Sequence, residues 1–238
     1  MSEKLKAISL GYIKYSESSL ILYVYSLEYG YLSLMLKGFF NKKKKNKAIL
    51  YPLTEITFIL PSNADKNKLI NIYSVDILNY FDDIFSHPIK SLQIQLIAEF
   101  LKNTFKEEPL NSDLYEYILK ALKNFSDKKD NFADFHLIFF KEIISLFGLK
   151  PMNNPNNNFF NLKEGNFLES QNYDYSIGEE ESLLFKKLLH QEFTLTSKTI
   201  FNQKERRILL DILFKYFEFH LSNFRSPQSL EILKHLIH

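Results

Sequence analysis

The chain has 238 residues, of which 45% are hydrophobic, 24% charged and 16% aromatic, and its formal net charge is +2. These values are typical of a folded protein with one large domain or two smaller ones. Cysteine is absent, which excludes disulfides, thiolate metal sites and a cysteine nucleophile. The sequence shows neither a signal peptide nor an apolar run of membrane-spanning length, so a cytoplasmic protein is expected.

The charge is distributed unevenly along the chain. Residues 1–50 carry nine lysines and three glutamates, for a net charge of +6. Residues 51–197 have a net charge of −7, and residues 198–238 a net charge of +3. A field of one sign on one part of a protein favours steering of a polyanion toward that part.

The first part of the chain is predicted to be a small β-barrel. The predicted strands cover residues 7–15, 19–27, 31–37, 53–60 and 69–75. Gly11 predicts a bend within the first strand, and Gly30 predicts a tight turn after the second. Five short strands favour a five-stranded OB-fold barrel over residues 1–80, the commonest such barrel that binds oligonucleotides.

From residue 81 onward the apolar residues recur at helical spacing, which predicts an all-helical domain over residues 81–238. Helices are predicted from Pro88 onward and over residues 112–125, 132–147, 178–190, 203–221 and 227–236. Ser112 is the expected N-cap of the second helix, and Gly148 the expected stop of the third. Residues 150–178 form an irregular lobe with a short hairpin that turns at Glu164 and Gly165. The predicted fold class is therefore α+β.

Residues 37–47, called here the lysine segment, contain six lysines, two phenylalanines and no acid. The segment follows the third predicted strand, where a flexible cationic loop is suited to phosphate contacts. The predicted DNA-binding residues are Lys37, Phe39, Phe40, Lys42, Lys43, Lys44, Lys45 and Lys47. The alternative is a solvated loop that only keeps the protein soluble.

Aromatic residues near the lysine segment are candidates for contact with bases. Phe39 and Phe40 are expected at the surface, where they touch bases or pack the base of the loop. Four strand tyrosines face either the barrel core or a groove: Tyr12, Tyr23, Tyr25 and Tyr31.

A second basic path is predicted near the C-terminus. It comprises Arg206, Arg207 and Lys215, for which ordinary helix-surface charge is the alternative. Arg225 is expected instead to be a buried structural arginine paired with an acid.

The sequence contains no recognisable catalytic constellation. Its six glycines do not form a phosphate-binding loop, and its six histidines are scattered. His136 lies in an apolar helical stretch and is expected to be a hydrogen-bonded core residue rather than a general base. We therefore expect a protein that is not an enzyme and holds no cofactor or metal.

Several stretches resemble one protein family. They are Gly-Tyr-Ile-Lys-Tyr-Ser-Glu-Ser-Ser-Leu-Ile-Leu at 11–22, Glu-Tyr-Gly-Tyr-Leu-Ser-Leu-Met-Leu-Lys-Gly at 28–38, Tyr-Phe-Glu-Phe-His-Leu at 216–221 and Arg-Ser-Pro-Gln-Ser-Leu-Glu-Ile-Leu at 225–233. In this order they resemble the bacterial recombination mediator RecO. The stretch at 159–167 is similar to a hairpin of members from the Bacteroidetes lineage.

This resemblance implies an N-terminal OB-fold, a helical C-terminal domain and a role in recombinational DNA repair. It also implies binding of single- and double-stranded DNA, annealing of complementary strands, and recombinase loading on DNA coated with single-strand-binding protein. The implied partners are RecR and the acidic C-terminal tail of the single-strand-binding protein.

The sequence departs from the family pattern at one point. Many members carry four zinc-binding cysteines after the third helix, where this chain has Met-Asn-Asn-Pro-Asn-Asn-Asn at 152–158. Zinc is therefore not expected, and packing of Phe159, Phe160 and Phe167 must hold the lobe instead.

Two other functions remain open from the sequence. In the first, the protein is an interaction adaptor whose helical half docks a partner while the lysine segment is only solubilising. In the second, the protein is a nuclease without a recognisable motif.

Overall fold

The computed structural model describes residues 2–41, 47–106, 110–152, 157–171, 174–194 and 198–236. Two compact units make up the chain. The first comprises Met1–Lys123 with Pro227–Ser229, and the second comprises Asn124–Ser226 with Leu230–His238. The domain boundary expected after residue 80 stays a prediction, because the first unit also includes the helical residues up to Lys123.

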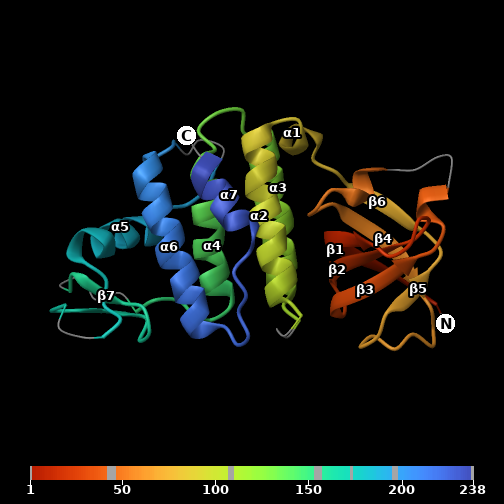
Figure 1. The fold of residues 1–238 in the computed structure, drawn as a ribbon, viewed down its shortest axis with the longest axis horizontal. Coiled ribbons are helices and arrows are strands. Elements are labelled where there is room, and N and C mark those ends of the chain that lie inside the picture. Colours follow the sequence, from red (N-terminus) through yellow and green to blue (C-terminus); the bar gives the residue numbers. More distant parts are fainter. Residues whose placement is uncertain are drawn as a thin grey trace. The chain divides into compact units, whose positions relative to one another are not determined.

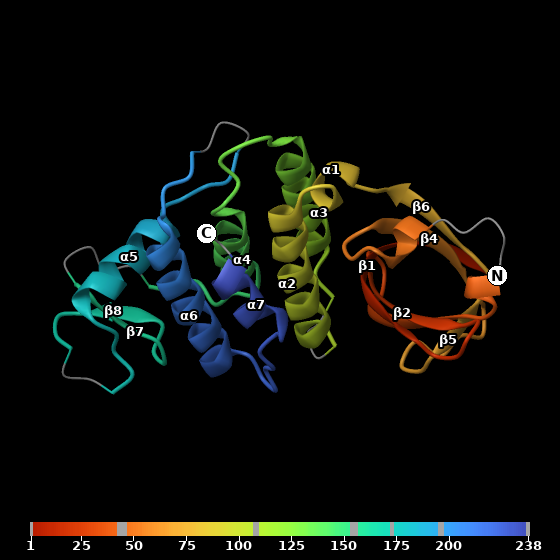
Figure 2. The same ribbon diagram turned by 45° about the horizontal axis from the view of Figure 1, so that its top comes forward.

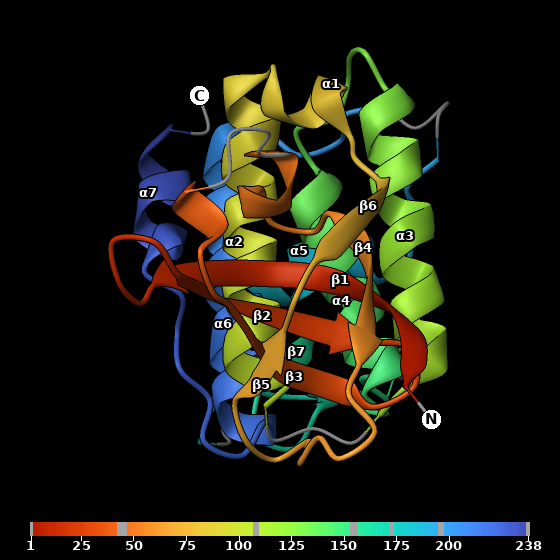
Figure 3. The same ribbon diagram turned by 90° about the vertical axis from the view of Figure 1, so that its right-hand side faces the viewer.

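The first unit contains a curled six-stranded sheet. Its strands are β1 (Glu3–Lys14), β2 (Leu20–Ser26), β3 (Gly30–Leu36), β4 (Glu55–Leu60), β5 (Ile70–Ile72) and β6 (Val75–Asn79). They lie in the order β5-β3-β2-β1-β4-β6, and only the β3–β5 pair is parallel within the described sheet. Figure 2 shows the sheet curling on itself, and Figure 3 shows β1, β2 and β3 side by side. This arrangement is the partly open barrel of the OB-fold.

The predicted number of five strands is wrong by one. The single strand expected over residues 69–75 is divided at Tyr73, which is 93% exposed. The residues before Tyr73 form β5, which pairs with β3. The residues after it form β6, which pairs with β4. One short apolar run therefore supplies both edges of the sheet.

Glycines shape the sheet at the two predicted positions. The register of β1 against β2 shifts between Ser9 and Gly11, and Gly11 has φ of +128°. Gly30 has φ of +69° in the turn between β2 and β3. Both φ values are positive, in a region that residues with a Cβ rarely adopt. The predicted bend and turn are therefore confirmed.

The barrel core forms from alternating residues of the strands. Leu22 and Val24 point inward with Leu34 of β3, and all three are fully buried. Tyr25 lies on the outer face of β2, but it is also buried, because its ring centroid lies 4.2 Å from that of Phe105. The outer face of β2 is therefore partly covered within the first unit.

Seven helices occur in the described residues (Figure 1): α1 (Asp82–Phe85), α2 (Pro88–Thr104), α3 (Ser112–Asp127), α4 (Phe135–Leu146), α5 (Glu179–Leu189), α6 (Gln203–His220) and α7 (Ser229–Leu236). The short α1 was not predicted. The N-cap of α3 is Asn111 rather than Ser112, since the Asn111 side chain accepts a hydrogen bond from Leu114 N at 3.1 Å. Gly148, with φ of +72°, follows the end of α4 as predicted.

The second unit is a helical bundle with a small two-stranded lobe. In α4, His136 is fully buried, as expected for a core residue, and Phe140 packs edge-on against Phe214 of α6. The lobe contains β7 (Phe159–Asn161) and β8 (Asn166–Leu168). Phe160 of β7 is buried against Phe185 of α5, so aromatic packing connects the lobe to the bundle. No described helix has the length and apolar character needed to cross a membrane.

Candidate nucleic-acid interface

The upstream end of the lysine segment is held against the barrel. Backbone N of Phe40 donates to the carbonyl of Ser18 at 2.9 Å, and N of Gly38 donates to Oγ of Ser19 at 3.4 Å. Both acceptors lie in the loop between β1 and β2. The structure therefore places the start of the segment beside a loop that binds oligonucleotides in many OB-folds.

Phe39 and Phe40 lie at the base of the segment rather than fully at its surface. Both side chains are half-buried and pack against the barrel core, with their rings edge-on at 5.2 Å. The ammonium group of Lys14 lies 5.9 Å from the Phe40 ring centroid. This placement favours packing of the loop base over contact with bases, and Lys14 adds a cation that the sequence did not single out.

The downstream end of the segment is also anchored. Residues 47–50 form a short 3₁₀ turn in which Ile49 is buried in the barrel core. Beyond it, Oγ of Ser9 donates to the carbonyl of Tyr51 at 2.9 Å, and Thr54 N donates to the Ser9 oxygen at 3.1 Å. Both flanks of the segment are thus attached to the barrel.

The cations of the segment are only partly described. Lys37 and Lys47 are exposed, one at each flank. The predicted Lys42, Lys43, Lys44 and Lys45 lie outside the described residues. The structure therefore brings the two flanking lysines to the rim of the barrel, and the roles of the other four remain predictions.

The second basic path contains residues in different environments. The Arg206 side chain is buried: its guanidinium lies 3.5 Å from the Asp134 carboxylate and also donates to the carbonyl of Phe201. Arg207 and Lys215 are exposed on α6. Arg225 is exposed as well, so the expectation of a buried arginine is wrong for this residue and describes Arg206 instead.

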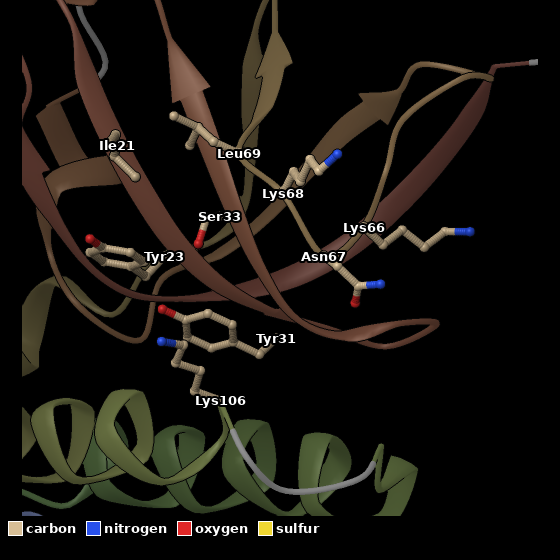
Figure 4. A pocket seen from close by; sticks show the side chains of 9 residues that line it. All are labelled: Ile21, Tyr23, Tyr31, Ser33, Lys66, Asn67, Lys68, Leu69 and Lys106. Carbon is tan, nitrogen blue, oxygen red and sulfur yellow. The ribbon is translucent and has the colours of Figure 1, made fainter.

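A pocket on the outer face of β2 and β3 was missed by sequence reasoning (Figure 4). It has a volume of about 370 Å³, and its lining includes Tyr23, Tyr31, Ser33, Lys66, Lys68 and Lys106; these and three further lining residues define the tyrosine pocket. The alternation of β2 does indicate an outward Tyr23. The lysines come from the 62–69 connection and from the end of α2, so only the fold brings them to the rings.

The aromatic wall of the tyrosine pocket is ordered by cross-strand neighbours. Tyr23 lies opposite Ser33, and this small residue leaves room for the ring of Tyr31. The two ring centroids are 6.1 Å apart with an angle of 21° between the planes. Lys102 Nζ lies 5.5 Å from the centroid of Tyr23. The result is a pair of near-parallel aromatic rings bordered by lysines.

Comparison with known proteins covers nearly the whole chain. Residues 1–81 match the family described as Recombination protein O N terminal, and residues 86–229 match Recombination protein O C terminal. The chain is 36% identical to a DNA repair protein RecO of Flavobacterium psychrophilum, with 98% of both chains covered. It is 32% identical to that of Flavobacterium johnsoniae over 99% of both chains, and 30% identical to that of Christiangramia forsetii over 97% of both.

These matches agree with the fold and with the order of motifs in the sequence. The N-terminal match covers the curled sheet, and the C-terminal match covers the helices from α2 onward together with the lobe. The expected role in recombinational DNA repair is thereby confirmed at the level of the family. The chain belongs to the recombination protein O (RecO) family of DNA repair proteins.

Proposed function

We propose that this protein binds single- and double-stranded DNA through its lysine segment and anneals complementary strands. It further assists loading of a recombinase onto DNA coated with single-strand-binding protein. In this role it is not an enzyme, and it acts at the nucleoid. Its proposed partners are RecR and the acidic C-terminal tail of the single-strand-binding protein, as the family resemblance suggests.

The observation that carries this proposal is the lysine segment and its attachment to the barrel. Six lysines and no acid lie within eleven residues, and the two flanks are anchored to the barrel core. A tethered cationic segment can follow a flexible polyanion without losing its position on the protein. Its attraction to phosphates does not depend on sequence, which suits a protein that must act at any site of damage.

Annealing follows from the same electrostatics. Two complementary strands repel each other through their phosphates, and neutralisation of both strands at one surface lowers this repulsion. Release of condensed counterions supplies the favourable free energy of binding. The protein then has to bring the strands together without covering the base edges that must pair.

The proposal is tested by the annealing of two complementary oligonucleotides that carry a fluorophore and a quencher. The strands are used bare and coated with single-strand-binding protein, each with and without RecR. We expect the protein to accelerate annealing of both forms, and RecR to change the rate on the coated strands. Substitution of Lys42, Lys43, Lys44 and Lys45 by alanine should remove most of the acceleration.

Two outcomes would contradict the proposal. Absence of any salt-sensitive DNA binding would instead indicate an interaction adaptor with a solubilising lysine segment. Cleavage of the oligonucleotides in the presence of Mg²⁺ or Mn²⁺ would indicate a nuclease.

A further inference from the structure

We propose that the tyrosine pocket receives one unstacked nucleobase of a single strand whose phosphates are bound by the lysine segment. This inference rests on the proposed function and extends it, because it gives the protein a site that duplex DNA cannot use. The occupant is a nucleotide within a single-stranded nucleic acid.

The chemistry of the pocket lining carries the inference. Tyr23 and Tyr31 present near-parallel rings, and both side chains are only half-buried. Aromatic faces of this kind stack with any base, which gives affinity without a preference for sequence. In a duplex each base is already stacked on its neighbours, so its face is not available to a side chain.

The positive charge of the pocket lining is suited to the phosphate of the nucleotide whose base stacks on the rings. Lys66, Lys68 and Lys106 border the pocket, and among the described residues that line it none carries a carboxylate. In Figure 4, Lys106 approaches the two rings from the end of α2. Lys68 is 3.3 Å from Asp65, which lies outside the lining, and Lys66 Nζ lies 4.0 Å from the ring centroid of Tyr29, so Lys106 is the best candidate for a phosphate contact.

Tyr31 also keeps the neutral form that an anionic ligand requires. Burial raises the pKa of Tyr31 to about 12, so its hydroxyl stays protonated throughout the physiological range. The pocket volume of about 370 Å³ falls at the lower end of the range for small-molecule sites, which fits one nucleotide rather than a longer segment.

The position of the pocket allows one strand to reach both sites. Tyr31 lies near the start of β3, and Lys37 follows the end of the same strand. Six residues of extended chain separate them by about 20 Å, a distance that a few nucleotides of extended strand can span. A single strand held by the lysine segment can therefore place one of its bases between the lysines of the pocket.

The test compares a single-stranded oligonucleotide with one of equal length in which abasic sites replace the central nucleotides, with binding measured by fluorescence anisotropy. Both strands carry the same phosphates, so the ratio of the two dissociation constants reports base contacts alone. We expect the wild type to bind the abasic strand about 5- to 150-fold more weakly, the range for loss of one stacked base. Tyr31→Leu should bind both strands with nearly equal affinity and should bind duplex DNA as the wild type does.

Matched variants separate stacking from other effects. Tyr31→Phe keeps the ring and should keep the preference for the normal strand. Tyr73→Leu removes a tyrosine that is 93% exposed and lies outside the pocket, and it should leave the ratio unchanged. Lys106→Ala changes an exposed side chain and should reduce the slope of log K against log salt for single strands by about 0.7.

The possible failures are distinguishable. If the wild type binds normal and abasic strands equally, or if Tyr31→Leu keeps the wild-type ratio, the pocket does not hold a base and the inference is overturned, while the proposed function stands. If the wild type binds neither strand, the proposed function itself fails. Equal losses on single-stranded and duplex DNA in Tyr31→Leu would also overturn the inference, since they would indicate a general effect on binding.

Discussion

Phe40 donates its backbone N–H to the carbonyl of Ser18 at 2.9 Å, which ties the lysine segment to the loop between β1 and β2. The ring of Phe40 is half-buried on the barrel core. The backbone and the side chain of one residue thus hold the start of the segment. This suggests that Phe40 positions the lysines and does not itself stack on bases.

The packing role of Phe40 predicts that Phe40→Ala lowers the free energy of unfolding by about 1–3 kcal/mol, less than for a fully buried phenylalanine. Phe40→Leu keeps an apolar side chain and should recover most of this loss. Urea denaturation measures both. If Phe40→Ala leaves stability unchanged but abolishes the preference for normal over abasic strands, the ring contacts bases and the packing role is wrong.

Two glycines of the second unit should respond differently to the same substitution. A Cβ on Gly165 would lie 2.7 Å from the hydroxyl oxygen of Tyr216, and φ at Gly165 is +67°. Gly148 has a similar φ of +72° but no atom within 4 Å of such a Cβ. Gly148→Ala should therefore cost about 1–2 kcal/mol for the backbone conformation alone, and Gly165→Ala should cost clearly more.

The double variant Gly165→Ala/Tyr216→Phe removes the hydroxyl that the new methyl group would meet. Tyr216→Phe alone is the reference for the hydrogen bond that this hydroxyl donates to the carbonyl of Leu149. Thermal unfolding of the four variants provides the comparison. Equal destabilisation by the two glycine substitutions would contradict the close approach of the lobe to α6.

Because Asp134 and Arg206 form a buried ion pair, we expect their contributions to the free energy of unfolding to be strongly coupled. Asp134 also accepts hydrogen bonds from N of Ile200 at 2.6 Å and from N of Phe201 at 3.2 Å, so it holds the segment before α6. Arg206→Met leaves a buried carboxylate without its cation and should cost about 3–5 kcal/mol. In a double-mutant cycle, adding Asp134→Asn should cost much less in the Arg206→Met background than in the wild type. Additive losses in urea denaturation would contradict the pairing.

Glu99 predicts a specific dependence of stability on pH. Its carboxylate accepts hydrogen bonds from Oγ of Ser229 at 2.6 Å and from N of Ser229 and of Gln228 at the start of α7. Burial alone would raise the pKa of Glu99, but these hydrogen bonds outweigh it and lower the pKa below its usual value. The stabilising contribution is therefore present above the unfolded-state pKa of about 4.3 and lost as the pH falls through the lower folded-state value.

Glu99→Gln should consequently lower stability by roughly 1 kcal/mol at pH 7, after allowance for solvent screening of a partly exposed group. The difference from the wild type should shrink as the pH falls below about 4. Glu116→Gln, an exposed change on α3, should show no such pattern. A constant difference at all pH values would contradict the role of the ionised carboxylate.

Much of the fold could be predicted from the sequence because local patterns dictate it. Alternation identified β2 and β3, and glycines marked the bend in β1 and the end of α4. The division of one apolar run into β5 and β6 could not be predicted, because it depends on which neighbouring strand each half meets. The early start of β1 was missed because one apolar residue, Leu5, between Lys4 and Lys6 is too short an alternation to indicate a strand, and only the pairing with β4 reveals it.

The candidate site was less predictable than the fold. The lysine segment is visible in the sequence because its charges are adjacent. Lys66 and Lys106 of the tyrosine pocket are forty residues apart, and each looks like ordinary surface charge until the chain is folded. Arg206 is the reverse case, because this basic residue was predicted for a surface path and is buried beside Asp134.

The most direct test of the lysine segment as the DNA-binding site is the salt dependence of binding to a single-stranded oligonucleotide. If about five of its lysines meet phosphates, log K against log salt should have a slope near −3.5. Substitution of Lys42, Lys43, Lys44 and Lys45 by alanine should flatten the slope to about −0.7, with equal losses of affinity on all sequences. A control variant with the same loss of charge replaces four exposed lysines elsewhere: Lys120, Lys123, Lys129 and Lys198. We expect a wild-type slope for this control, whereas an unchanged slope and affinity in the segment variant would show that the lysine segment is not the DNA-binding site.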